Sequence, residues 1–97
     1  MVEFKKVKNE NIKTLELYVP IVARVHGGSH PEFHEVHRIF NEMIIKIKKT
    51  KLKKLELDKE FKELRKITDN YKVPTDTCES YEAVYNILSK LDEAYYR

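Results

Sequence analysis

The side chains best suited to chemistry in this 97-residue chain are four histidines that lie within twelve positions of one another. They are His26, His30, His34 and His37. Imidazole is the commonest metal-binding side chain, and a separation of three or four residues places two rings on the same face of a helix. One interpretation is therefore a metal or haem site. The other interpretation is structural: His30 caps a helix, His34 is solvated, and His37 bonds to a backbone carbonyl from an apolar face.

The carboxylates near the histidines do not follow the patterns of the common metal sites. A carboxylate-bridged di-iron bundle uses Glu-x-x-His pairs that face inward from several helices, and neither Glu-x-x-His nor His-x-x-x-Glu occurs in the chain. Residues 34–37 read His-Glu-Val-His, which resembles the zinc-protease motif His-Glu-x-x-His. The second histidine comes one residue early, so the general-base geometry of that motif is not met.

Cys78 is the single cysteine of the chain, so no intramolecular disulfide can form. A lone thiol is typical of a reducing compartment, which predicts a cytoplasmic location. Two interpretations of this side chain remain open. At the start of a helix the exposed N–H groups stabilise a thiolate, which favours a reactive thiol. A thiol with no resolving partner is more often a small packing residue.

The elements that must position these side chains are predicted to be helices. Apolar residues make up 41% of the chain and charged residues 36%, with only two glycines and three prolines. This composition favours helices over a turn-rich β fold. We expect one domain, residues 1–97, folded as an all-α, up-and-down bundle of three to four helices. Residues 1–10 are charged and aperiodic, which indicates a flexible lead-in.

The first helix is predicted to begin near residues 9–11, because asparagine is a good N-cap. Its apolar residues recur at helical spacing, at Ile12, Leu15, Val19, Val22 and Val25. Pro20 interrupts that pattern and predicts a kink or a restart of the helix. Gly27 and Gly28 predict its end, since glycine adopts the left-handed conformation at little cost.

The second and third helices have clearer limits. Ser29 or His30 is the expected cap of the second, with Pro31 at its first position, where the missing N–H costs nothing. The apolar face of this helix then runs from residue 33 to 47. The third helix is predicted through residues 57–67 and ends at residues 70–73, because Pro74 disfavours helix at the residue before it.

The fourth helix is predicted to start at a capping box formed by Asp76 and Glu79. Its apolar stripe covers residues 81–95. Short connections between amphipathic helices imply that sequence neighbours pack antiparallel.

Two segments resemble a known family. Residues 25–33 read Val-His-Gly-Gly-Ser-His-Pro-Glu-Phe, and residues 67–78 read Ile-Thr-Asp-Asn-Tyr-Lys-Val-Pro-Thr-Asp-Thr-Cys, followed by Tyr81 and Tyr85. In this order the two segments are similar to segments of the hemerythrin-like di-iron proteins that repair iron–sulfur clusters. The resemblance covers roughly residues 15–95 with a deletion in the middle. It implies a helical bundle of hemerythrin type.

The same resemblance implies that this chain does not retain the two-iron ligand set of the family. Thr50 and Lys54 stand where the resemblance places a ligand histidine and a ligand glutamate. The Glu-His pair expected near residues 55–58 is missing, and the chain stops at Arg97, just before the place of the last ligand pair. A lysine at such a position opposes a cationic site, because burying it unpaired costs several kcal/mol. The resemblance thus implies a shortened, hemerythrin-like fragment stripped of its ligands.

These observations predict a non-catalytic helical module that acts by self-association or through a protein partner, with no cofactor. The alternative is a stress-response protein that binds iron, another transition metal or haem through the four histidines. An enzyme that acts through Cys78 is a third, more distant hypothesis. The net charge is only +3, and the lysine-rich segment 46–54 is followed at once by acidic residues, so nucleic acid is not an expected partner. No apolar run approaches the length of a membrane span.

Overall fold

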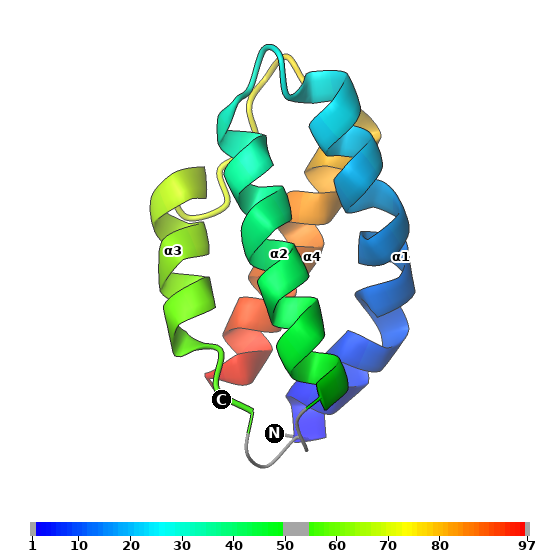
Figure 1. Ribbon diagram of the computed structural model, residues 1–97, viewed down its shortest axis with the longest axis vertical. Coiled ribbons are helices and arrows are strands. Elements are labelled where there is room, and N and C mark those ends of the chain that lie inside the picture. The colour runs from blue at the N-terminus through cyan, green and yellow to red at the C-terminus, as the bar shows by residue number, and fades with distance from the viewer. Residues whose placement is uncertain (1, 50–54, 97) are drawn as a thin grey trace.

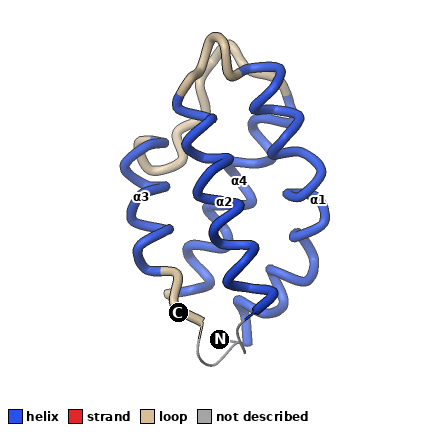
Figure 2. Tube along the Cα trace, viewed as in Figure 1, coloured by secondary structure: helices blue, strands red, loops and turns tan. Residues whose placement is uncertain are grey.

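The computed structural model describes residues 2–49 and 55–96, and every regular element in those two ranges is an α-helix (Figure 1). The helices are α1 (Val2–His26), α2 (Glu32–Lys49), α3 (Asp58–Thr68) and α4 (Glu79–Tyr95). Successive helices run in opposite directions, as Figures 1 and 2 show. This confirms the prediction of an all-α, up-and-down bundle, with four helices in the described residues.

This topology places two connections at the same end of the bundle. The turn between α1 and α2 and the longer connection between α3 and α4 meet at the top of Figure 2. We call this end, formed by residues 26–32 and 69–79, the loop end. The C-terminal end of α1 and the N-terminal end of α4 both lie there. The two chain termini lie at the opposite end.

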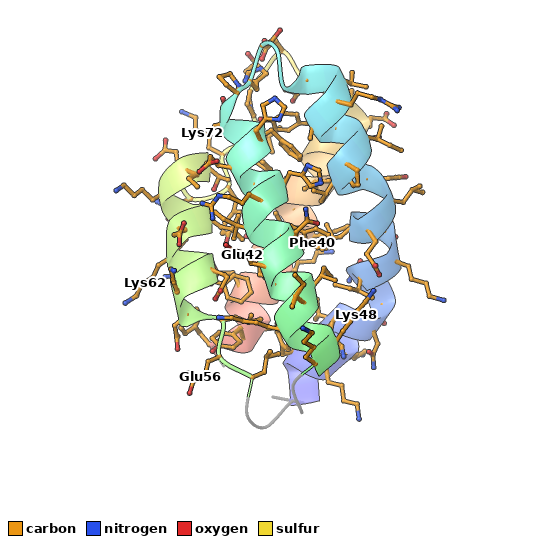
Figure 3. The ribbon with its side chains drawn as sticks, in the orientation of Figure 1. Phe40, Glu42, Lys48, Glu56, Lys62 and Lys72 are labelled. Carbon is orange, nitrogen blue, oxygen red and sulfur yellow. The ribbon has the colours of Figure 1, made fainter. Side chains whose placement is uncertain are left out.

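The core forms where the apolar faces of the four helices converge. α1 packs most extensively against α4, and α2 packs against α3. The largest fully buried side chains are Phe4, Leu15, Phe33, Ile39, Met43, Leu57, Phe61, Leu64, Tyr81, Tyr85, Leu88 and Leu91. Charged side chains such as Lys62 point away from the bundle (Figure 3). The apolar periodicity therefore predicted the buried faces of α2, α3 and α4 correctly. It was wrong for Val25, which the pattern places on the apolar face of the first helix and which is 62% exposed.

The flexible lead-in predicted for residues 1–10 is wrong for residues 2–10, the part of it that the structure describes. α1 begins at Val2, and the ring of Phe4 is fully buried, edge-on to Tyr95 with the ring centroids 5.7 Å apart. Val7 is half-buried against the core. These two side chains extend the apolar stripe of α1 by two turns, because they occupy the face that Leu15 continues. The charged residues between them obscured that periodicity in the sequence.

The ends of the helices also differ from the predictions. α1 continues through Pro20 without a restart. It ends at His26, as the two glycines indicated, but neither Gly27 nor Gly28 has a positive φ. α4 is capped by Cys78, with no side-chain hydrogen bond at the cap. The capping box is not formed, because Asp76 binds a histidine instead.

Left-handed residues follow α3, where the chain turns back towards α4. Asp69, Asn70 and Tyr71 have φ values of 53°, 60° and 65°. Three consecutive non-glycine residues in this region are strained, so neighbouring contacts must hold them. The Tyr71 hydroxyl donates to Asp92 on α4 over 2.6 Å, and the Tyr71 amide donates to the Thr68 hydroxyl.

Asp92 is the polar link between α3 and α4. Its carboxylate is buried and accepts two hydrogen bonds from the Arg65 guanidinium, from Nε over 2.8 Å and from a terminal nitrogen over 2.6 Å. The hydrogen bonds to Asp92 raise the pKa of Arg65 above its ordinary value. Arg65 also lies over the ring of Tyr96, 4.7 Å from its centroid. One carboxylate thus joins two helices and the strained turn.

Within residues 2–49 and 55–96, none of the helices is long and apolar enough to cross a membrane. Two positions at which the resemblance places metal ligands, Thr50 and Lys54, lie outside the described residues. So does most of the lysine-rich segment 46–54.

Candidate functional site

The loop end brings together a histidine from the first half of the sequence and the single cysteine from the second half. His26 is the last residue of α1, and Cys78 is the N-cap of α4. His26 Nε2 lies 3.1 Å from Cys78 Sγ, across a separation of 52 residues. The thiol is exposed and the imidazole is half-buried. A nucleophile and a base within hydrogen-bond reach are the pattern of an activated thiol.

His30 lies at the same end between two carboxylates. Its Nδ1 is 3.1 Å from Glu32 Oε2, and its Nε2 is 3.0 Å from Asp76 Oδ1. Partial desolvation lowers the pKa of His30, but the hydrogen bonds to Glu32 and Asp76 outweigh it and raise that pKa above the ordinary value of 6.5. Through these two contacts His30 ties the connection before α4 to the start of α2.

The ring of Tyr81 packs against the rings of both His26 and His30. His26 meets it edge-on with the centroids 5.4 Å apart, and His30 does so at 5.6 Å. Tyr81 is fully buried, and its hydroxyl lies 3.2 Å from that of Tyr85. Burial is the main cause that raises the pKa of Tyr81, and the hydrogen bond to Tyr85 raises it further. The phenol therefore stays neutral and serves to hold the two imidazoles in place.

The other two predicted ligands do not join this group. His34 is exposed on α2 and its ring packs beside Gly27, while His37 is half-buried further along the same helix. No three His, Cys, Asp or Glu side chains in the described part of the chain are arranged to hold one metal ion. The four histidines therefore do not meet as one ligand set, because His26 and His30 each turn towards a partner from the other connection.

A cavity of about 480 Å³ lies against the loop end. Residues of the 67–76 segment line it together with Glu32 and Tyr85. Its charged lining holds the carboxylates of Glu32, Asp69 and Asp76 and the ammonium of Lys72. This excess of negative charge suits a small cationic or hydroxyl-bearing group better than an anion.

The sequence identified His26, His30 and Cys78 as candidates but gave no sign of the carboxylate partners of His30. Asp76 was expected to cap a helix, not to contact His30. A usable signal was present in the predicted topology: in an up-and-down bundle, the end of the first helix and the start of the fourth lie together. That argument places His26 near Cys78 without any structure.

The two glycines that follow His26 allow a matched pair of substitutions that tests how tightly the turn is packed. We expect Gly27→Ala to lower the free energy of unfolding by about 1–3 kcal/mol, because the added methyl group meets the backbone carbonyl oxygen of Ala23 and the ring of His34. Gly28→Ala meets nothing within 4 Å, so a change within about 0.5 kcal/mol is expected. Urea unfolding of both variants tests this, and equal effects would show that the space around Gly27 is not limiting.

The ion pairs of His30 predict a pH dependence. Because the folded-state pKa lies above 6.5, the stabilisation from this residue is fully present below that pH and is lost as the pH rises through the folded pKa. The difference in urea midpoint between the wild type and His30→Asn should therefore be larger near pH 6 than above about pH 8. Asp76→Asn removes one of the two partners, so it should weaken this dependence. A difference that does not change with pH would contradict the assignment.

Comparisons with protein-family models, with curated proteins and with solved structures find no match to this chain.

Proposed function

We propose that the chain is a non-catalytic helical module that acts by pairing with a second copy of itself. The observation that carries this proposal is an exposed apolar row on α1. Leu17, Ile21 and Val25 are 59%, 38% and 62% exposed. Their spacing of four residues places them one above another on the same helix face. A row of large apolar side chains left in solvent is typical of an interaction surface, whereas single exposed ones are not.

The row is self-complementary, which favours a second copy as its partner. If two α1 helices pair antiparallel about a two-fold axis at Ile21, Leu17 of each copy lies beside Val25 of the other. Ile21 then meets its own counterpart. Such an isologous contact covers all three side chains in both copies with one surface. The net charge of +3 on each chain opposes the approach of two copies only weakly.

The size of this contact predicts a reversible dimer. Full burial of an aliphatic side chain contributes about 1.5–3 kcal/mol, and these three are already partly covered. Loss of translational and rotational freedom on association costs about 4 kcal/mol or more. We therefore expect monomer and dimer to exchange, with the dimer favoured at high protein concentration.

We further propose that the module is a ligand-stripped relative of the hemerythrin-like iron–sulfur cluster repair proteins, in the cytoplasm and within their stress-response context. Support comes from the four antiparallel helices, which the resemblance implies, and from the two similar segments, which together build the loop end. The single cysteine supports the location. The metal-binding alternative has less support, because the four histidines do not converge.

The oligomeric state tests the proposal. Light scattering coupled to size exclusion should show a mass that rises from monomer towards dimer with concentration. Ile21→Glu should keep the protein monomeric, because it buries two carboxylates at the two-fold axis. Ile45→Glu, at an isoleucine on α2 that is 54% exposed, is the matched control and should leave the dimer intact. A wild type that is monomeric at every concentration, or a dimer that only Ile45→Glu disrupts, overturns the proposal.

A further inference from the structure

We infer that His26 and Cys78 form a thiol–disulfide exchange site, at which low-molecular-weight disulfides add to Cys78. This inference is independent of the pairing proposed for α1. It starts from an imidazole at the end of α1 and a thiol at the start of α4, which the fold brings to 3.1 Å. The thiol is exposed, so a small disulfide has access to the sulfur.

The position of each group suits its role. Cys78 is the N-cap of α4, at the helix end where the first-turn N–H groups have no partner within the helix. His26 presents Nε2 to that sulfur, and its ring is held edge-on against the buried Tyr81. His30 does not compete for the thiol, because both of its nitrogens are engaged by carboxylates.

The exchange step balances with groups that are present and one disulfide. With the His26 proton on Nδ1, Nε2 accepts the proton of the Cys78 thiol. The Cys78 sulfur attacks one sulfur of the disulfide, a new S–S bond forms, and the old one breaks. Its electron pair leaves with the departing thiolate, which takes the proton back from His26. Cys78 is oxidised to a mixed disulfide, and one half of the small disulfide is reduced to a thiol.

The product persists until an external thiol removes it. Cys78 is the single cysteine of the chain, so there is no resolving thiol to expel the added group. The site is therefore a reversible modification site and not a turnover site. The added group sits at the junction between the two connections of the loop end.

The test uses glutathione disulfide as the probe, with intact mass as the readout. The wild-type protein should gain one glutathionyl group, and His26→Gln should react roughly tenfold more slowly, since an unassisted thiol is only a few per cent thiolate at neutral pH. His34→Gln is the matched control, because this neighbouring histidine is exposed on α2, whereas the imidazole at 3.1 Å from the thiol is that of His26. Its rate should equal that of the wild type.

A second measurement covers the case in which His26→Gln does not fold. The wild type should react faster in its native state than in urea, where His26 and Cys78 separate. Equal rates in the two states, or equal rates for the two histidine variants, overturn the inference. A disulfide between two chains in place of the glutathione adduct also overturns it, because the partner is then a second Cys78.

Discussion

Replacing Phe4 by alanine is expected to lower the free energy of unfolding by about 3–5 kcal/mol. The ring is fully buried and packs edge-on against Tyr95, near the other end of the chain. Truncation leaves a cavity between the first turn of α1 and the end of α4. The expected loss is a large share of the 5–15 kcal/mol that is typical of a folded domain. Urea unfolding followed by circular dichroism measures it.

Ile45→Ala is the control for this substitution. It also truncates a large apolar side chain, but that side chain is 54% exposed, so a loss of less than about 1 kcal/mol is expected. If Phe4→Ala and Ile45→Ala unfold at the same urea concentration, the first turn of α1 is not docked, and residues 1–10 behave as a lead-in.

Replacing Asp92 by asparagine is expected to lower the free energy of unfolding by about 3 kcal/mol, the lower end of the roughly 3–5 kcal/mol that breaking a buried ion pair costs. The Asp92 side chain is 8% exposed, and its carboxylate accepts hydrogen bonds from the Arg65 guanidinium and the Tyr71 hydroxyl. An amide keeps the shape but has one acceptor oxygen, and its NH₂ group faces a donor. Because the Arg65 side chain is 37% exposed, water compensates for part of the loss.

Two further variants separate the contributions around Asp92. Asp69→Asn makes the same chemical change at an exposed, left-handed position that asparagine tolerates, so its effect should stay within about 0.5 kcal/mol. Tyr71→Phe removes one neutral donor to the carboxylate and should cost about 1 kcal/mol. If Asp92→Asn costs no more than Asp69→Asn in urea unfolding, the Arg65–Asp92 pair does not hold α3 to α4.

The loop end connects these stability predictions to the proposed chemistry. Tyr71 anchors the strained turn that begins the connection to α4, and Asp76 and Cys78 lie further along that connection. Weakening the anchor at Asp92 should therefore also loosen the contact between His26 and Cys78. Glutathione disulfide kinetics on Asp92→Asn can detect this at urea concentrations where the variant is still folded.

The all-helical fold and the buried faces of α2, α3 and α4 followed from the sequence alone. A residue that recurs every three or four positions lies on one face of a helix whatever surrounds it, so the stripes of α2, α3 and α4 were predictable. Local rules were less reliable where a tertiary contact competed with them. The charged residues beside Phe4 obscured the apolar periodicity that would have predicted its burial. The carboxylate of Asp76 contacts His30 and therefore does not form the expected helix cap.

Only the tertiary structure decided which side chains of the candidate site meet. The sequence marked His26, His30 and Cys78 as chemically capable, and an up-and-down topology places the end of α1 beside the start of α4. Whether His26 faces Cys78 depends on how each helix is rotated about its axis, and packing around the buried Tyr81 sets that rotation. Pairwise spacing along the chain has no information about such a rotation, because it arises from contacts between residues that are far apart in sequence.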